Sequence, residues 1–237
     1  MNIEISLEDL LKNGSHFGHN KKRWNPKMNK FIYGEKNGTH VIDLRKSLPL
    51  IENALKFAHE SSKNKKKFLF VSTKKQHSEI VENIAKETNN YFVNFRWLGG
   101  MITNWNTVKN SINTLNNYEN ILNTEDTVFT KKELSDIEKK KIRLDKTLGG
   151  IVEMKSTPDV IFIIDTNREH IAVLEAKKLG IPIIGIVDTN CDPDLIDYPI
   201  PANDDGVKSV QFILDNLKKV LVSSEDTSSA ESTTKNE

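Results

Sequence analysis

The sequence predicts an α/β protein built around a mostly parallel β-sheet. Two unbroken apolar runs, 160–164 and 181–187, are each closed by an aspartate, as is typical of strands buried on both faces of a sheet. Between them lies a segment of helical length with apolar residues at Ile171, Leu174 and Leu179 among charged ones. Because parallel neighbours need a crossover of about this length, the two runs are predicted to be adjacent strands at the centre of the sheet.

The other elements alternate between extended and helical patterns. In chain order, the sequence predicts a capped helix after Ser6, a hairpin over 31–42, a helix over 47–61, a strand over 68–71, a helix over 78–88, a strand over 91–95, and, beyond the central pair, a strand over 198–202 and a helix from Val207 to Leu217.

Residues 104–151 interrupt this alternation. They carry two apolar stripes with spacings of three and four, made of Val108, Ile112, Leu115 and Leu122, and of Leu134, Ile137, Leu144, Leu148 and Ile151. A helix of about 26 Å would project from a globular domain. The predicted organisation is therefore an α/β domain over 1–103 and 152–222 with a basic N-terminal loop, an inserted antiparallel coiled-coil hairpin over 104–151, and a disordered acidic tail over 223–237.

Composition narrows the class of protein. The net charge of +1 hides an acidic tail of −3, which leaves +4 on the rest of the 237 residues. Cys191 is the only cysteine, which excludes an intramolecular disulfide and a cysteine-rich zinc site. No apolar run approaches the ~20 residues of a membrane span, and the N-terminus lacks a signal-peptide pattern. These observations predict a cytoplasmic protein with no membrane partner.

Basic residues gather with aromatic ones in two places. The first is 17–30, which holds Phe17 and Trp24 together with Lys21, Lys22, Arg23, Lys27 and Lys30. The second is 95–100, with Arg96 and Trp97, and a further lysine cluster ending at Lys74 and Lys75 precedes it. Cationic side chains bind phosphates and aromatic rings stack on exposed bases, so these segments predict an RNA-binding surface. The alternative for each tryptophan is packing in the core with its N–H satisfied.

Carboxylates follow two of the predicted strands and predict a possible cation site. Asp188 ends one strand and Asp204 and Asp205 follow the next, so a parallel sheet would bring them to one edge, where His19 could join them. Such a set suits zinc or, with water, magnesium. Alternatively, Asp204 and Asp205 occupy the first turn of the last helix, and Asp165 and Asp188 cap the loops they begin. No cofactor is required by any other pattern, because Walker, GxGxxG and GxSxG motifs are absent.

Four stretches resemble a known family: HFGHNKKRWNPKMNKFIYGEKNGTHVIDL, FRWLGGMITNW, LGGI, and PDVIFIIDTNREHIAVLEAKKLGIPIIGIVDTNCDPDLIDYPIPANDD. In this order they resemble the bacterial-type second protein of the small ribosomal subunit. The resemblance implies a flavodoxin-like three-layer domain with an inserted helical hairpin. It also implies binding to small-subunit rRNA and to other proteins of the subunit, and recruitment of the large first protein that captures messenger RNA. The matched positions nearest the implied surface are Phe17, His19, Arg23, Trp24, Asn25, Lys27, Arg96, Trp97 and Asn104.

Two other classes of function remain open from the residues. An enzyme or small-ligand-binding protein could use the carboxyl edge of the sheet, since one fold serves many chemistries. A free adaptor could act through the helical arm. The sequence favours a structural, RNA-binding ribosomal component with no small-molecule substrate. It contains neither a phosphate-binding loop nor a nucleophile with a nearby base, and an enzyme would be expected to have one of these.

Overall fold

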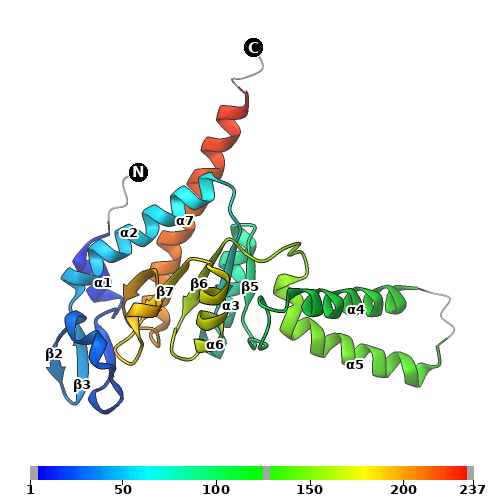
Figure 1. Ribbon diagram of the computed structural model, residues 1–237, viewed down its shortest axis with the longest axis horizontal. Coiled ribbons are helices and arrows are strands. Elements are labelled where there is room, and N and C mark those ends of the chain that lie inside the picture. The colour runs from blue at the N-terminus through cyan, green and yellow to red at the C-terminus, as the bar shows by residue number, and fades with distance from the viewer. Residues whose placement is uncertain (1–4, 125–128, 234–237) are drawn as a thin grey trace.

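A five-stranded sheet forms the centre of the computed structural model, which describes residues 5–124 and 129–233 (Figure 1). Its strands are β4 (Phe68–Val71), β5 (Tyr91–Val93), β6 (Val160–Ile164), β7 (Ile183–Val187) and β8 (Tyr198–Pro201). They lie in the order β5-β4-β6-β7-β8, and every neighbouring pair is parallel. Numbered along the chain this is 2-1-3-4-5, the order of flavodoxin-like sheets. The predicted parallel sheet is confirmed.

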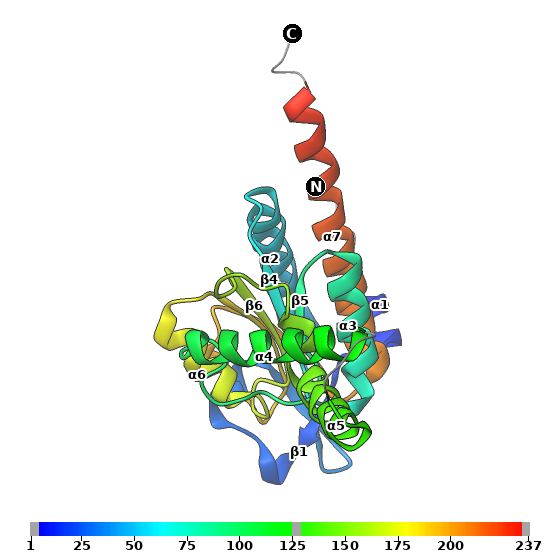
Figure 2. The same ribbon diagram turned by 90° about the vertical axis from the view of Figure 1, so that its right-hand side faces the viewer.

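Helices cover both faces of this sheet and give three layers. On one face α2 (Leu44–Lys63), α3 (Ser78–Glu87) and α7 (Val207–Thr233) pack over Phe68 and Phe70, and on the other α6 (His170–Leu179) shares a core with Leu69 and Val71. This alternation along β4 follows from the two-residue period of a strand. In both views α7 runs on beyond the body of the molecule (Figure 1 and Figure 2).

A small antiparallel sheet adjoins the main one, with strands β1 (Phe17–Asn20), β2 (Ile32–Lys36) and β3 (Thr39–Ile42) in the order β1-β3-β2. The predicted hairpin is confirmed as β2 and β3. The sequence did not predict β1, because its glycine and mixed side chains show no period of two. Helix α1 (Leu7–Lys12) begins as predicted, with the Ser6 side chain accepting from the backbone N–H of Asp9. Short 3₁₀ turns complete the chain at Lys21–Arg23, Pro26–Phe31, Lys75–His77, Gly149–Ile151 and Pro193–Leu195.

Helices α4 (Trp105–Asn123) and α5 (Lys131–Leu148) pack against each other and project from the sheet (Figure 1). Both lie in the stretch where the sequence predicts two helices, and Val108, Ile112 and Leu115 of the first stripe are buried. Residues 125–128, between the helices, lie outside the described part of the chain. That the pair is a coiled-coil hairpin remains a prediction.

The helix predicted between the two apolar runs is present as α6, and the tail differs from the expectation. On α6 the large residues Ile171, Leu174 and Leu179 are exposed, whereas the small Ala172 and Ala176 are buried, because a helix that lies close to a sheet needs small side chains at the contact. The tail predicted to be disordered from residue 223 continues α7 to Thr233. No proline or glycine follows residue 206, so nothing in the sequence stops the propagation of a helix already begun. Residues 234–237 lie outside the described range.

Among residues 5–124 and 129–233, none of the helices combines the length and the apolar character that crossing a membrane requires.

Candidate functional site

The carboxyl ends of the five parallel strands form one edge, and polar side chains follow each of them. Arg96 comes after β5, Lys74 after β4, Asp165 after β6, Asp188 after β7 and Asp204 after β8. Open α/β sheets bind their ligands at this edge. The edge therefore has a cationic side chain at its β5 end and carboxylates at its β8 end.

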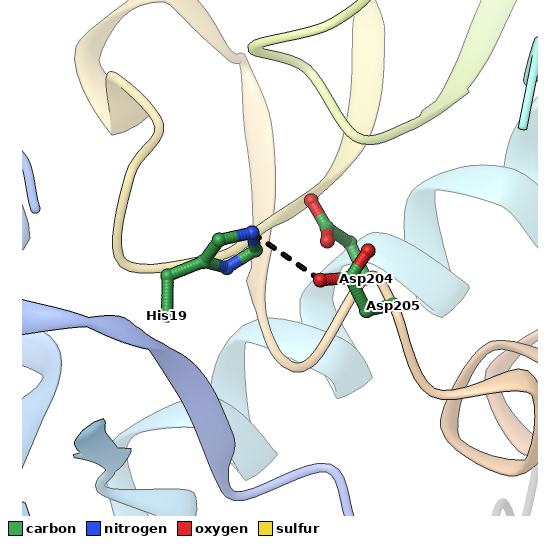
Figure 3. A group of neighbouring side chains, drawn as sticks. All are labelled: His19, Asp204 and Asp205. Carbon is green, nitrogen blue, oxygen red and sulfur yellow. Dashed lines mark ion pairs between the residues drawn. The ribbon is translucent and has the colours of Figure 1, made fainter. Parts of the chain in front are cut away.

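Strand β1 brings His19 to the acidic half of the edge. Its backbone N–H donates to Asp188 Oδ1 at 3.2 Å and to Thr189 Oγ1 at 2.9 Å. Its ring atom Nδ1 lies 3.0 Å from Asp188 Oδ2. On the other side of the ring, Nε2 lies 3.3 Å from Asp205 Oδ2 (Figure 3). The hydrogen bond to Asp188 raises the pKa of His19 to about 9 although burial opposes it, so the imidazole is charged at neutral pH.

A glycine makes this close approach possible. A Cβ at Gly18 would lie 2.7 Å from Thr189 Cγ2 and 3.0 Å from the carbonyl oxygen of His40. The first distance is shorter than Cβ atoms tolerate, and the second is tighter than most Cβ contacts. Only glycine thus lets β1 come near enough to Thr189 for the His19 backbone to bond to the loop after β7.

Lys74 is a buried cation and not part of an exposed RNA-binding surface, which corrects the sequence prediction. Its Nζ lies 2.7 Å from Asp165 Oδ2, 3.0 Å from Asp204 Oδ1 and 2.7 Å from Asp205 Oδ1, and only 12% of the side chain is exposed. Burial alone would lower the pKa of Lys74, but the surrounding carboxylates raise it well above its ordinary value. The positive charge of Lys74 is therefore balanced by carboxylates of the protein itself.

Asp204 has one carboxylate oxygen left over. The residue is fully buried, and its Oδ2 has no hydrogen-bond partner among the residues described. Burial, with repulsion from Asp165 and Asp188, raises the pKa of Asp204 to about 7. When all are ionised, the four carboxylates carry four negative charges against two positive charges from Lys74 and His19, a net of −2 on the side chains Asp165, Asp188, Asp204, Asp205, Lys74 and His19.

The four residues predicted as metal ligands are brought together, but not as four equivalent ligands. Ligand atoms of His19, Asp204 and Asp205 lie within 4.8 Å of one another. Asp188 instead holds the Nδ1 side of the imidazole, the position of a carboxylate that orients a metal-binding histidine. A second group, Asp165, Cys191 and Asp204, also converges, but burial raises the pKa of the Cys191 thiol to about 12, so it is protonated at neutral pH.

Asp165 joins the two halves of the edge. One of its oxygens binds Lys74, and the other accepts the backbone N–H of Arg168 at 2.9 Å. Its φ of 61° places it in the left-handed region, which is costly for a residue with a Cβ and persists where surrounding contacts hold it. The predicted capping role of Asp165 is therefore present together with its ion pair.

The basic loop after β1 contains two kinds of cation. Lys21 pairs with Glu35 at 2.8 Å and Lys27 with Asp192 at 2.7 Å, and Lys30 lies 3.7 Å from Asp194 Oδ1. Lys22 and Arg23 are exposed and make no ion pair with any residue in the described ranges. Within this loop, Lys22 and Arg23 are therefore the cations whose charge is not offset by a carboxylate of the described residues.

Two aromatic rings lie in the same stretch as these free cations. Phe17 is 54% exposed, and Trp24 is 36% exposed and stacks on His40 with 5.3 Å between ring centres. We call Phe17, Lys22, Arg23 and Trp24 the N-terminal basic surface. Asn25 connects this surface to the loop after β7. Its side-chain oxygen accepts the backbone N–H of Lys27, and its own backbone N–H donates to the carbonyl oxygen of Thr189 at 2.8 Å.

Trp97 is buried, which agrees with the alternative that the sequence left open for it, packing in the core with its N–H satisfied, and not with a place on the RNA-binding surface. Its indole N–H donates to Glu175 Oε1 at 3.0 Å. The same buried carboxylate accepts from the backbone N–H groups of Gly100, Ile102 and Thr103 and from the Thr103 hydroxyl. Sequence reasoning missed Glu175, although an acid among the small residues of α6 was the available signal. Asn104, at the start of α4, is exposed as predicted, and its Oδ1 accepts from the Thr107 hydroxyl.

The lysine cluster of 63–75 is not one patch in space. Lys63, Lys65 and Lys66 are exposed at the amino end of β4, and Lys74 and Lys75 lie beyond its carboxyl end. Four residues of extended strand separate the two groups by about 13 Å.

The family model described as "Ribosomal protein S2" matches residues 10–224. A relative from Wolbachia pipientis subsp. Culex pipiens (strain wPip) is 56% identical over 211 residues, 88% of this chain and 78% of the relative. Relatives from Rhizobium leguminosarum bv. trifolii (strain WSM2304) and Brucella ovis are 48% and 50% identical over 219 residues, 92% of this chain and 86% of each relative. All three bear the name "Small ribosomal subunit protein uS2". The chain belongs to the ribosomal protein S2 family.

Proposed function

We propose that this chain is a structural component of the small ribosomal subunit that binds ribosomal RNA through its N-terminal basic surface. Membership of the ribosomal protein S2 family over nearly the whole chain carries the ribosomal role. This family is a structural, non-enzymatic component of the subunit, so the alternative of an enzyme at the carboxyl edge is not pursued. Its place of action would be the cytoplasmic ribosome.

The RNA-binding part of the proposal is supported by charge and exposure. Lys22 and Arg23 form no ion pair within residues 5–124 and 129–233, and the exposed rings of Phe17 and Trp24 lie in the same short segment. Unpaired cations bind phosphates with release of counterions, and exposed rings can stack on unpaired bases. The docking of β1 on the main sheet holds this surface rigidly, which favours a defined contact.

The protein partners belong to the same proposal. The family resemblance supports contact with other small-subunit proteins and recruitment of the large first protein that captures messenger RNA. The projecting pair α4 and α5, proposed here to be a coiled-coil hairpin, offers a surface far from the N-terminal basic surface along the chain.

A charge reversal tests the RNA contact. Lys22→Glu with Arg23→Glu is expected to lower incorporation into small subunits at least about tenfold, because two phosphate contacts become repulsive. The matched control is Lys63→Glu with Lys66→Glu, which makes the same charge change at the amino end of β4. Incorporation is measured by sucrose-gradient sedimentation of cells that express tagged variants, and the occupancy of the first protein is measured on the same fractions. Equal incorporation of both variants would remove the N-terminal basic surface from the proposal.

We also propose that the edge holds a divalent cation, zinc or magnesium, on His19, Asp204 and Asp205. Lys74 uses Oδ1 of both aspartates, which leaves Asp204 Oδ2 without a partner and Asp205 Oδ2 facing His19 Nε2. Three ligand atoms therefore converge. Binding of the ion would release the His19 proton, and the four carboxylates, when all are ionised, would then outnumber the positive charge of Lys74 by three, an excess that attracts a divalent cation. Nitrogen and oxygen ligands in this number suit zinc, or magnesium with added waters.

Anomalous scattering at the zinc edge, from crystals grown with zinc, tests the cation proposal. A peak between His19 and Asp204 that disappears in His19→Ala is expected. Absence of the peak under zinc-replete conditions, together with unchanged thermal stability on addition of magnesium, would end it.

A further inference from the structure

A hollow of about 490 Å³ opens at the carboxyl edge where β4 lies between β5 and β6. It is lined by residues that follow these three strands: Thr73, Phe95, Arg96, Trp97, Arg168, Glu169 and Ile171. From β4 the chain continues to β5 on one side, while β6 lies on the other, so the hollow is at the topological switch point of the sheet. This is where open α/β sheets bind nucleotide-sized ligands. We call it the switch-point hollow.

Two arginines give the hollow an excess of positive charge. Arg96 is exposed and forms no ion pair with residues in the described part of the chain. Arg168 donates from Nε to the Thr73 hydroxyl at 2.9 Å, and over half of its side chain is exposed. Glu169 is the opposing charge: its Oε1 lies 3.9 Å from Arg168 Nε, but the residue is buried and the same oxygen accepts the N–H and the hydroxyl of Thr73. Both guanidinium groups thus keep N–H donors for an anion.

An apolar wall accompanies these donors. Phe95 exposes 57% of its surface and Ile171 exposes 43%, and both line the hollow. Any of the four bases can stack on an exposed phenylalanine ring, because every base has a planar π face. Of the two aromatic residues in the segment 95–100, the structure exposes Phe95 and buries Trp97.

Phe95 and Arg96 lie directly before a segment that is anchored to α6. Glu175 of α6 accepts five hydrogen bonds from the segment between Trp97 and Thr103. A site built on a segment held in this way loses little conformational entropy when a ligand binds.

We infer that the switch-point hollow binds one unstacked nucleotide of ribosomal RNA, with its phosphate on Arg96 and Arg168 and its base on Phe95. The inference rests on the proposed RNA-binding function and adds a second contact to it. The occupant is single-stranded, because a helix keeps its bases stacked and paired and presents none to a hollow of this size.

The test measures binding of a fluorescein-labelled single-stranded RNA decanucleotide to the full chain by anisotropy at several salt concentrations. Arg96→Gln with Arg168→Gln is expected to weaken binding about tenfold and to reduce the slope of log K against log salt by about 0.7, since one phosphate of the single strand is no longer neutralised. Phe95→Leu is expected to weaken binding about tenfold with an unchanged slope, since only stacking is lost.

Three controls separate the inference from its alternatives. Arg143→Gln with Lys140→Gln removes the same charge from α5 and should leave affinity within about twofold, since one pair of charges outside the site contributes little. Arg96→Lys with Arg168→Lys should restore the salt slope. Competition by adenosine or guanosine 5′-monophosphate identifies the source of the nucleotide: the inference expects millimolar competition at most, and a free nucleotide that binds as tightly as the RNA would overturn it.

Failure of the inference can be distinguished from failure of the proposed function. If the switch-point variants bind RNA like the α5 control while Lys22→Glu with Arg23→Glu does not, the RNA-binding function stands and the hollow has no part in it. If wild-type protein binds neither the oligonucleotide nor small-subunit RNA, the proposed function itself fails. Melting temperatures of all variants within a few degrees of wild type would exclude unfolding as the cause.

Discussion

Glu175 is a single carboxylate that organises a whole segment. It is buried on α6, and its two oxygens accept five hydrogen bonds from Trp97, Gly100, Ile102 and Thr103. Burial raises the pKa of Glu175, but these donors outweigh burial and hold it below its usual value. A carboxylate that is solvated by donors in this way stabilises the ionised native form.

The sign of the pH dependence follows from this shift. Because the native pKa of Glu175 lies below the unfolded value of 4.5, its contribution to the free energy of unfolding is fully present above that value and is lost as the pH falls through the native pKa. We expect Glu175→Gln to cost about 2–4 kcal/mol at pH 7 and to flatten the acid limb of stability. Urea unfolding at several pH values measures this. Glu60→Gln, an exposed acid on α2, is the control, and equal losses in both variants would contradict the prediction.

Gly18 is the second residue on which the site depends. In Gly18→Ala the added methyl would meet Thr189 Cγ2 at 2.7 Å, so β1 must move from the loop after β7. We expect a loss of about 1–3 kcal/mol, measured by chemical unfolding. Combining it with Thr189→Ser removes the clashing methyl and keeps the hydroxyl that His19 uses. The double variant should recover part of the loss, and strict additivity would show that the clash is not the cause.

At the scale of elements, α6 packs on the sheet through its small residues and not through its largest apolar ones. Its large apolar residues Ile171 and Leu174 face outward, and alanines face the sheet. The close approach brings Glu175 within reach of Trp97. A helix with large residues at the contact would lie farther from the sheet and lose that hydrogen bond.

This inversion gives a direct test by substitution. Leu174→Gln should change the free energy of unfolding by less than about 0.5 kcal/mol, because the side chain is already solvated. Ala176→Leu should cost about 1–3 kcal/mol, because the added atoms have no space against the sheet. Thermal unfolding of the two variants should therefore rank them opposite to their hydrophobicity, and a larger loss for Leu174→Gln would show that the outward face packs on something in solution.

The sequence was sufficient for elements with strong periodicity and insufficient where tertiary contacts decide. The apolar run of β6 needs no context, because strands buried on both faces are recognisable from composition alone. The gathering of His19 with Asp188, Asp204 and Asp205 followed from strand ends meeting at one edge. Burial of Lys74 could not be predicted from the chain, and burial of Trp97 stayed one of two alternatives, because each depends on partners about 80 to 130 positions away in sequence.

On the scale of the whole molecule, the helix that ends the chain continues past the last large apolar residues of its sequence. In the part of α7 whose side chains are described, up to Val222, the last buried residue is Leu221, and the helix continues to Thr233. The sequence from residue 223 onward contains no large apolar residue, so it can add little apolar burial to stability. We expect removal of residues 223–237 to shift the melting temperature by no more than about 2 °C, by calorimetry. A control truncation after Asn216, which also removes Leu217, Val220 and Leu221 from the core, should unfold the protein, and a large loss from the shorter truncation would assign the tail a role in folding.

The position of Asp165 has a consequence for both ends of the sheet edge. One carboxylate holds the ammonium group of Lys74 with one oxygen and begins the turn to Arg168 with the other. A cation beside Asp204 and Asp205 would repel the ammonium group of Lys74 and so change its contact with Asp165, and a nucleotide that moves the backbone of Arg168 would change the other contact of the same carboxylate. Reciprocity then requires that each occupant alter the affinity of the other by the same factor. Ion and RNA would thus be thermodynamically coupled through one side chain, in a protein that carries out no reaction.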